Sequence, residues 1–304
     1  MAINWSKAGQ YLKGPHSFKK KLCFWFFSLF FTLLIATYII IPPIWLLKWG
    51  SIEIVQWPRT GQQVTKVGPN EKNWVKLSTV SRHVINAIIV AEDARFYNHD
   101  GVDFTEVFIS LRTNIEKRRH VRGASTITQQ VVKNAFLSRE KSYTRKFREA
   151  LGAIALELIM SKNDIMEWYI NITEFGGGVY GIRSAANFYF NTKPELLTIQ
   201  EGANLALVIP SPNGWAIGLK QKRLTEFGHA RYAQIINRMY QNKLITNALK
   251  TSALATGDFG RPVKAYLVDE HEAFQDSELF LNDNDPAMPQ KTRLNPKSPI
   301  KRSK

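Results

Sequence analysis

Apolar residues recur at a helical period through most of the chain between residues 80 and 241, and this period predicts α-helices. The expected helices cover residues 80–92, 104–118, 125–136, 143–160, 162–170, 182–190, 199–208 and 222–241. Runs that alternate between apolar and polar positions, which are typical of strands, are sparse. The pattern therefore predicts a mainly α fold.

The expected helix at residues 143–160 carries an apolar stripe that we expect to be buried. Its members lie at helical spacing: Phe147, Leu151, Ile154 and Leu158. Glu149 lies about 200° around the helix from Phe147, so it points away from the stripe and lies beside Arg145 and Lys146. It is either a functional acid or one half of an ordinary ion pair with Arg145, which stabilises a helix by only a few tenths of a kcal/mol.

The first apolar segment is of another kind, because residues 22–47 contain no charged side chain. About 20 apolar residues cross a bilayer, so the segment predicts a single transmembrane helix. Only basic charges precede it, and the positive-inside rule then leaves the N-terminus in the cytoplasm and the rest of the chain outside the cytoplasmic (inner) membrane. A cleaved signal peptide is the alternative, but its apolar run is usually about 7–15 residues and no small-x-small cleavage site follows here.

The remaining composition suggests one globular domain behind this segment. With 44% hydrophobic residues among 304, the chain can bury one sizeable core. The expected organisation is a cytoplasmic arm at 1–21, the transmembrane helix at 22–47, a linker at 48–72, a globular domain at 73–244 and a C-terminal extension, partly disordered, at 245–304.

The chain is strongly basic, with a formal net charge of +16. Nucleic acid is a poor explanation, because no nucleic-acid module is recognisable and the domain is expected to face outward. Anionic lipid head groups explain the excess better. Cys23 is the only cysteine, so neither an intramolecular disulfide nor a thiolate metal cluster can form.

Two adjacent carboxylates, Glu92 and Asp93, directly follow an apolar run at residues 84–91. Burial disfavours the charged form of a carboxylate and raises its pKa toward neutrality, which suits a general base. The alternative is a pair of solvated or capping acids at the end of a helix. Asp93 either tunes the pKa of Glu92 or bonds backbone amides of the following turn.

A second polar block spans residues 122–134. Ser125 or Thr126 can cap a helix whose free N–H groups then face an anion. Three donors for phosphate or sugar oxygens follow within one turn of one another: Gln129, Gln130 and Lys133. The alternative is an ordinary capped polar helix.

The order of these blocks resembles the peptidoglycan glycosyltransferase family (family 51). Its motifs read approximately E-D-x-x-F-x-x-H-x-G, G-x-S-T-x-T-Q-Q-x-x-K-N and R-K-x-x-E, and they match here at residues 92–101, 123–134 and 145–149. Further blocks resemble the family at residues 162–190 and 197–212. Residues 171–181 look most similar to the monofunctional biosynthetic transglycosylases. Only about ninety residues follow Pro212, fewer than a typical domain, and no transpeptidase motif is present, so no transpeptidase is expected.

The resemblance implies a two-lobed, lysozyme-like, mainly α glycosyltransferase domain that polymerises lipid II with inversion at the donor carbon. It also implies that Glu92 is the general base and that Glu149, the second acid, orients cations or a divalent ion such as Mg or Mn. Pyrophosphate departure would be assisted by Lys133, Arg145, Lys146 and, more weakly, Lys141. Sugar or phosphate oxygens would be held by Ser125, Gln129 and Gln130.

The remaining motif residues are expected to support the site. These are Asp93, Phe96, His99 and Gly101, of which Phe96 and His99 would brace the turn after Glu92. The apolar residues Phe104, Val107, Phe108 and Leu111 either dip into the bilayer or pack in the core. Beyond lipid II, the growing glycan and the membrane, proteins of cell-wall synthesis are expected partners, and nucleic acid is not. A lysozyme-like hydrolase and a non-catalytic membrane scaffold are the competing functions; neither needs both the pyrophosphate-binding cations and two acids.

Overall fold

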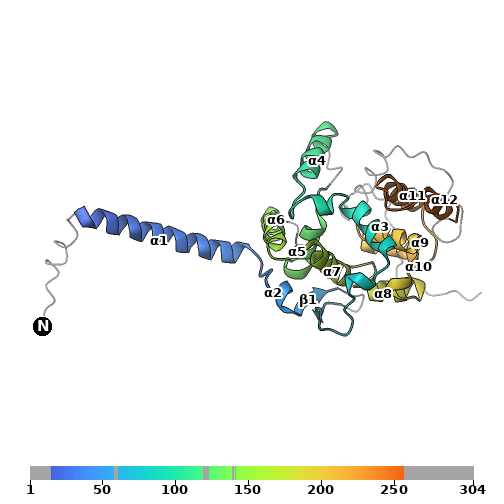
Figure 1. Ribbon diagram of the computed structural model, residues 1–304, viewed down its shortest axis with the longest axis horizontal. Helices are drawn as coiled ribbons and strands as arrows, with labels where there is room; N and C mark the ends of the chain where they lie inside the picture. Colours follow the sequence, from blue (N-terminus) through green and yellow to red (C-terminus); the bar gives the residue numbers. More distant parts are fainter. Residues whose placement is uncertain (1–14, 58–60, 119–122, 139, 141, 257–304) are drawn as a thin grey trace, which may run out of the picture.

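The computed structural model describes residues 15–57, 61–118, 123–138, 140 and 142–256, without the side chains of 15–19, 33–39 and 213. This part of the chain is mainly helical, as predicted, and α1 extends from the globular body as a rod (Figure 1). The helices are α1 (Pro15–Ile40), α2 (Leu46–Trp49), α3 (Arg82–Glu92), α4 (Phe104–Glu116), α5 (Ile127–Phe136), α6 (Tyr143–Glu157), α7 (Lys162–Ile172), α8 (Ile182–Phe190), α9 (Ile199–Val208), α10 (Pro212–Lys220), α11 (Glu226–Gln241) and α12 (Asn247–Thr256). Short 3₁₀ turns η2 (Leu77–Thr79), η3 (Phe96–Asn98) and η4 (Pro194–Leu196) and strands β1 (Ile52–Gln56) and β2 (Gln63–Val67) complete the set.

Some of the predicted features lie outside the described residues. They are Lys141, residues 1–14 of the expected arm and residues 257–304 of the expected extension. The part of that extension that is described, α12, packs against α11 and buries Ala253.

The core is organised around α3, whose apolar side chains are buried nearly all round. α3 packs most extensively against α9 and also contacts α11. The closest approach is at Gly202, where a Cβ atom would lie 3.0 Å from the Cα atom of Val84. A glycine there lets α9 lie directly against α3. This packing holds in place the C-terminal end of α3, where Glu92 lies.

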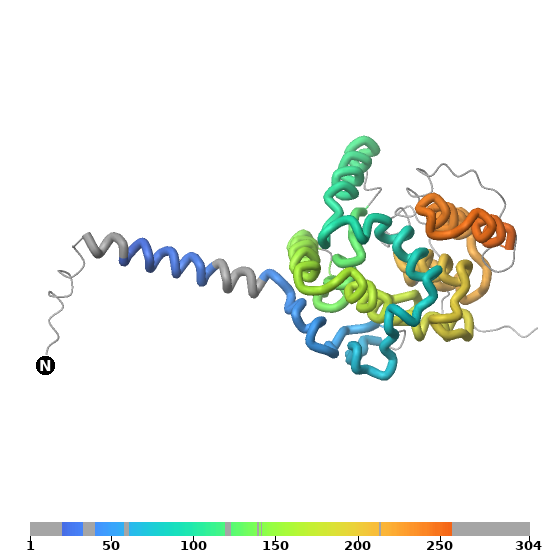
Figure 2. Tube along the Cα trace, viewed as in Figure 1, coloured from blue at the N-terminus to red at the C-terminus, as the bar shows by residue number. Residues whose placement is uncertain are grey.

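A second group of helices consists of α5 with α6 and α7 packed against it. In the view of Figure 2 this group and the α11–α12 pair lie on opposite sides of α3. Each predicted helix is present, with ends that differ by a few residues. α10 was not predicted, because Pro212 and Gly214 resemble turn residues; Pro212 instead occupies the first helical turn, where its missing N–H is tolerated.

The segment predicted as a linker contains an antiparallel hairpin in which Ile52 pairs with Val67 and Gln56 with Gln63. Ile52 and Ile54 are buried, and β1 lies against α5. A two-stranded hairpin is marginal by itself, so docking on the helical body is what stabilises it. The sequence pattern of five-residue strands was too short to reveal this.

The segment predicted to span the membrane has two parts. α1 ends at Ile40, whose carbonyl oxygen accepts a hydrogen bond from Arg148 Nε at 2.9 Å. Ile44 and Leu47 then pack in the core, and Trp168 Nε1 donates to the Leu47 carbonyl oxygen at 3.1 Å. Among the residues described, no helix is both long and apolar enough to cross a membrane.

Of the apolar stripe predicted to be buried on α6, Phe147, Ile154 and Leu158 are exposed and only Leu151 is partly buried, which corrects that expectation. Phe147 is 58% exposed and Leu158 82% exposed, whereas Glu149 is only 2% exposed. α6 packs on α5 through small residues such as Gly152 and Ala153, which are buried. Periodicity located the apolar stripe correctly but could not tell that the core faces the opposite side of the helix.

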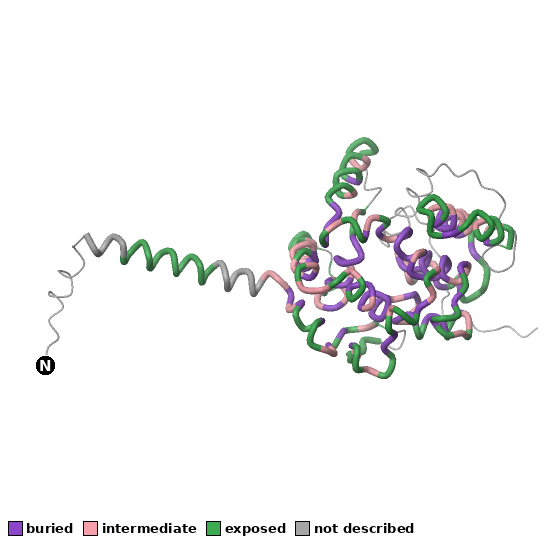
Figure 3. The backbone as a smooth tube through the Cα atoms, viewed as in Figure 1, coloured by how far each residue is buried: buried purple, intermediate pink, exposed green. Residues whose placement is uncertain are grey.

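α4 is also apolar on its surface. Phe104, Phe108 and Leu111 are exposed, and Ser110 is the buried residue of this helix. Figure 3 shows α4 projecting from the body with mainly exposed residues along its length. Core packing of these side chains, one of the two alternatives left open by the sequence, is therefore wrong.

Candidate active site

Glu92 is the last residue of α3, where the helix ends between α5 and α11. Its side chain is half-buried, and its Oε2 accepts a hydrogen bond from Gln130 Nε2 at 2.7 Å. Burial raises the pKa of Glu92 above the ordinary value, and the Gln130 hydrogen bond and the charges of Arg231 and Lys133 oppose this only in part. A carboxylate in such surroundings can take a proton near neutral pH.

Asp93 joins the end of α3 to the start of α5. Its Oδ2 accepts a hydrogen bond from the Ile127 backbone N–H at 3.0 Å, and His99 Nε2 lies 3.1 Å from both of its oxygens. The carboxylate thus bonds a backbone amide, one of the two expected roles. Its charge also contributes, as the smallest of the causes, to the raised pKa of Glu92.

Contacts with α6 and α7 hold the turn after Asp93 in place. Phe96 is fully buried, and Lys162 of α7 lies over its ring and donates from Nζ to the His99 carbonyl oxygen. Gly101 has φ +86°, and a Cβ atom on it would lie 2.6 Å from the Ala153 carbonyl group of α6. Only glycine allows the turn to lie this close to α6. These contacts agree with the supporting role expected for the motif residues.

Gln129 and Gln130 at the start of α5 were both expected to bind substrate, but their surroundings differ. Thr126 caps the helix and forms a capping box with Gln129, whose Oε1 accepts from the Thr126 N–H at 3.0 Å. Gln129 is 3% exposed, so its position does not favour the substrate contact expected of it. Gln130 points instead to Glu92. Ser125 lies just outside the cap and is exposed.

The cations of the motif on α6 converge on the buried carboxylate of Glu149. Arg145 Nη1 lies 3.0 Å from its Oε2, and Lys146 Nζ lies 2.6 Å from its Oε1. Lys146 Nζ also donates to Ser125 Oγ at 2.7 Å, which links α6 to the start of α5. Glu149 is therefore more than an exposed helix-surface partner of Arg145. It fixes the positions of two cations at once.

Lys133 connects the two acids of the site. Burial lowers the pKa of its ammonium group, while the charges of Glu149 and Glu92 raise it and those of Lys146 and Arg145 lower it. Lys133 therefore lies within electrostatic reach of both carboxylates. The structure brings Glu92, Gln130, Lys133, Ser125, Arg145, Lys146 and Glu149 together at the adjoining ends of α3, α5 and α6.

Among the described residues, Asp93, His99 and Asp103 lie close enough together to be considered as metal ligands. Protein groups account for their arrangement. Asp93 is engaged by His99 and Ile127, as described above, and Asp103 caps α4 and lies 3.3 Å from Arg95 Nε. We therefore assign these three residues a structural role. The expected divalent ion near the pyrophosphate stays a prediction, since Glu149 is already paired with two cations.

Sequence reasoning missed two buried polar residues that contact the immediate neighbours of Glu92. Tyr169 of α7 donates to Gln130 Oε1 at 3.3 Å, and Arg231 of α11 donates to the Ala91 carbonyl oxygen at 3.2 Å. Both are buried in a helix whose inward stripe is otherwise largely apolar. The available signal was a polar residue among apolar ones on the inward face of a helix. Such a signal does not reveal which distant residue the side chain contacts.

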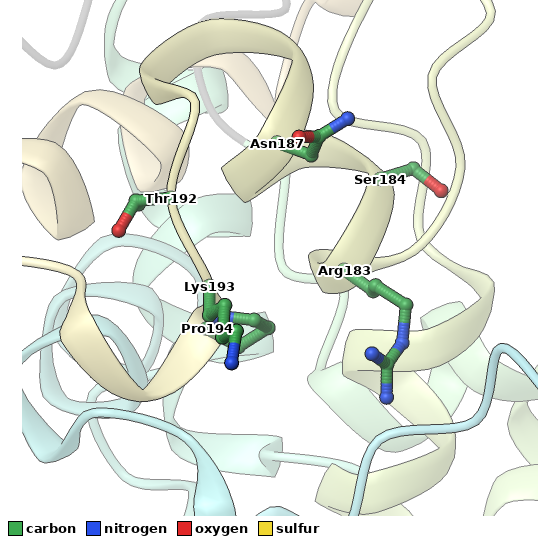
Figure 4. A pocket seen from close by; sticks show the side chains of 6 residues that line it. All are labelled: Arg183, Ser184, Asn187, Thr192, Lys193 and Pro194. Carbon is green, nitrogen blue, oxygen red and sulfur yellow. The ribbon is translucent and has the colours of Figure 1, made fainter.

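A separate pocket of about 360 Å³ lies between α8 and η4. Its lining residues are Arg183, Ser184, Asn187, Thr192, Lys193 and Pro194 (Figure 4). Figure 4 shows Thr192 pointing to the side opposite from Ser184 and Asn187, so the polar groups do not converge on one point. No residue predicted to act in the site lines this pocket.

Comparison with known proteins agrees with the motif pattern. A family model described as transglycosylase matches residues 60–240. A biosynthetic peptidoglycan transglycosylase of Paraburkholderia xenovorans is 44% identical over 142 residues, which cover 47% of this chain and 59% of that protein. The chain thus spans somewhat more than half the length of this relative.

Two further proteins of the same name are matched over a larger share of their length. The one from Dechloromonas aromatica is 38% identical over 175 residues, which cover 55% of this chain and 75% of that protein. The one from Nitrosomonas eutropha is 34% identical over 212 residues, which cover 63% of this chain and 87% of that protein.

Proposed function

Because the chain belongs to the transglycosylase family, we propose that it is a monofunctional peptidoglycan glycosyltransferase that polymerises lipid II into β-1,4-linked glycan strands for the cell wall. The proposal depends mainly on the different partners of the two acids in the site. Glu92 is half-buried beside an amide donor, whereas Glu149 is buried between two cations. The first arrangement suits proton transfer and the second suits an anionic leaving group.

In the proposed reaction, the acceptor 4-hydroxyl oxygen attacks the anomeric carbon of the donor sugar. Glu92 takes the hydroxyl proton as the carbon–oxygen bond forms. The bond from the anomeric carbon to the pyrophosphate oxygen breaks, and its electron pair leaves with undecaprenyl pyrophosphate. Attack from the face opposite the leaving group converts an α-linked donor into a β-linked product.

The leaving pyrophosphate would be stabilised by the cations that Glu149 holds in place. Arg145 and Lys146 already have fixed positions in their ion pairs with Glu149, so they need little reorganisation when charge develops, and Lys133 of α5 lies within electrostatic reach of both. Ser125, at hydrogen-bond distance from Lys146, would bind an oxygen of the same group. A glycan hydrolase has no use for such a cluster, and a scaffold protein does not need either acid.

The reaction would take place in a cleft between two lobes, as in lysozyme-like folds. The helices around α3, α9 and α11 would form one lobe, and α4 would belong to the other, smaller one. Glu92 lies at the end of α3, next to the polar start of α5. This placement supports the assignment of the cleft to the region between these elements.

The protein would be anchored in the cytoplasmic (inner) membrane by α1, with a cytoplasmic N-terminus and the catalytic domain outside. The described side chains of α1 include Phe24, Trp25 and Phe26, each about two-thirds exposed. Exposed apolar residues also line α4 and the outer face of α6, as at Phe108 and Leu158. Exposed large apolar side chains on these helices support contact with lipid, where the lipid-linked substrate would reside.

The proposal is tested by incubating the detergent-purified full chain with labelled lipid II, beside the Glu92→Gln and Glu167→Gln variants. Glu167 is a matched control, because its carboxylate bonds Trp74 Nε1 and the Leu77 N–H away from the site. We expect a muramidase-digestible polymer from the parent and from Glu167→Gln, and none from Glu92→Gln. Hydrolysis of preformed glycan, or binding of lipid II without polymer, would contradict the proposal.

A further inference from the structure

A continuous hydrogen-bond path connects a buried tyrosine to the carboxylate of Glu92. Tyr169 of α7 is fully buried, and its hydroxyl donates to Gln130 Oε1 at 3.3 Å. The other end of the same amide donates from Nε2 to Glu92 Oε2 at 2.7 Å. The path thus runs from α7 through α5 to the end of α3.

The side-chain amide of Gln130, in the middle of this path, has two chemically different ends. A glutamine amide carries an acceptor oxygen on one side and a donor NH₂ group on the other, and a half-turn of the amide exchanges them. An ionised carboxylate only accepts hydrogen bonds. Gln130 therefore supports the ionised form of Glu92 in one orientation and opposes it in the other.

The Tyr169 hydroxyl donates its proton to the Gln130 oxygen in this arrangement. Burial, with a smaller contribution from the charge of Glu92, raises the pKa of Tyr169 well above its ordinary value, so the hydroxyl keeps its proton. Rotation of the Gln130 amide would place its NH₂ group opposite this hydroxyl and would turn its oxygen toward the carboxylate of Glu92. An ionised Glu92 only accepts hydrogen bonds and therefore selects the observed orientation of the amide, and the Tyr169 hydroxyl stabilises that orientation by donating to the Gln130 oxygen.

We propose that Tyr169 is a positioning residue for the proton transfer, which holds the Gln130 amide so that its NH₂ group faces Glu92. The proposal rests on the proposed function, in which Glu92 is the base. Tyr169 need not touch the substrate, because it acts through Gln130. Its role is to keep the carboxylate ready to accept a proton.

Other charged groups also act on Glu92 and must be kept constant in any test. They are Asp93 beside it on the chain, Lys133 of α5 and Arg231 of α11. Arg145, Lys146 and Glu149 of α6 act on Lys133, and Arg238 acts on Arg231. None of these side chains is altered when the Tyr169 hydroxyl is removed.

The first test is the pH dependence of polymerisation by Tyr169→Phe, which retains the ring and removes only the hydroxyl. We expect the acidic limb of kcat/KM to move to higher pH by about one unit, a tenfold loss below the limb, with activity recovered above it and KM unchanged. The matched control is Tyr189→Phe, which removes a buried hydroxyl that bonds the Phe175 carbonyl oxygen at 2.9 Å. Its limb should stay in place. An unmoved limb in Tyr169→Phe, or an equal loss at every pH, would overturn the proposal.

A second variant keeps the test decisive if Tyr169→Phe does not fold. Gln130→Met removes the amide and leaves Tyr169 intact, so it should move the acidic limb in the same direction. In the double variant the two shifts should not add, because Tyr169 has no effect without the amide. Additive shifts, or an unmoved limb in Gln130→Met, would mean that Tyr169 does not act through Gln130.

Failure of this inference is distinguishable from failure of the proposed function. If the parent makes no polymer, Glu92 is not a transferase base and the proposed function itself fails. If the parent makes polymer and loses it in Glu92→Gln, but all tyrosine variants share the parent's acidic limb, only the positioning role fails.

Discussion

Arg231 of α11 donates from Nη2 to the carbonyl oxygen of Ala91, the residue directly before Glu92, at 3.2 Å. Arg231 is 3% exposed, and burial lowers the pKa of its guanidinium to about 10, with the charge of Glu92 acting in the opposite direction. A cation at the C-terminus of a helix is stabilised by the helix dipole and by the unpaired carbonyl groups there. Arg231 therefore both anchors the end of α3 and supplies positive charge near Glu92.

Replacing Arg231 by Met should affect stability and activity together. The Ala91 carbonyl loses a buried donor, for which we expect a loss of about 1–3 kcal/mol in the free energy of unfolding. The charge that favours ionised Glu92 is also lost, so the acidic limb of polymerisation should move to higher pH. Thermal unfolding and the pH profile measure the two effects. Arg238→Met is the control, because Arg238 bonds the Val90 carbonyl oxygen at 3.4 Å and is not among the charges that shift the pKa of Glu92.

Glu92→Gln should be more stable than the parent at neutral pH. Because burial raises the pKa of Glu92 in the folded state, the folded protein binds this proton more tightly than the unfolded chain does. Stability from this group is therefore complete below the ordinary pKa near 4.5 and is lost as the pH rises through the folded pKa. Glutamine does not ionise, so the variant escapes this loss, about 1.4 kcal/mol per unit of pKa shift.

The unfolding temperatures of the parent and of Glu92→Gln, measured from acidic to neutral pH, check this prediction. The two curves should coincide at low pH and separate as the pH rises. A variant that is equally or less stable than the parent throughout would show that Glu92 is not destabilised by burial.

Glu149→Gln should weaken catalysis more than substrate binding. The amide keeps the shape of the carboxylate but loses the charge that holds Arg145 and Lys146, both of which are partly exposed. Because solvent screens these cations, we expect a stability loss of only about 1–3 kcal/mol, less than for a fully buried ion pair. Misplaced cations should lower kcat by about 10- to 100-fold. Glu167→Gln, which alters a carboxylate bonded to neutral donors, should lose stability without this fall in kcat.

The exposed apolar face of α4 should contact lipid. Phe108→Cys in a Cys23→Ser background gives a single site for an environment-sensitive fluorophore on the full chain in proteoliposomes. Phe108 is 67% exposed, and so is Leu196 of η4 at 66%, which makes Leu196→Cys a matched control. We expect a blue-shifted spectrum from the probe at position 108 alone. Equal, water-like spectra at both positions would contradict contact between α4 and the membrane.

Much of the fold and part of the site could be predicted from the sequence. Helical period placed α3 to α9 closely, because each of these helices has an apolar stripe of its own. The apolar run before Glu92 left open a buried acid with a raised pKa and a solvated or capping acid, and the structure has a half-buried acid whose pKa is raised by burial. The motif at residues 145–149 predicted that Arg145 and Glu149 would meet, since they lie one turn apart on the same helix.

What depended on contacts between distant segments could be decided only by the tertiary structure. Neighbouring residues on a helix point about 100° apart, so Gln129 enters the cap of α5 while Gln130 reaches Glu92. Periodicity likewise defined the two faces of α6 but not which one meets α5, and Glu149 proved to be on the buried face. Tyr169 bonds Gln130 and Arg231 bonds Ala91 across long separations in the chain, and the local sequence pattern does not identify such distant partners.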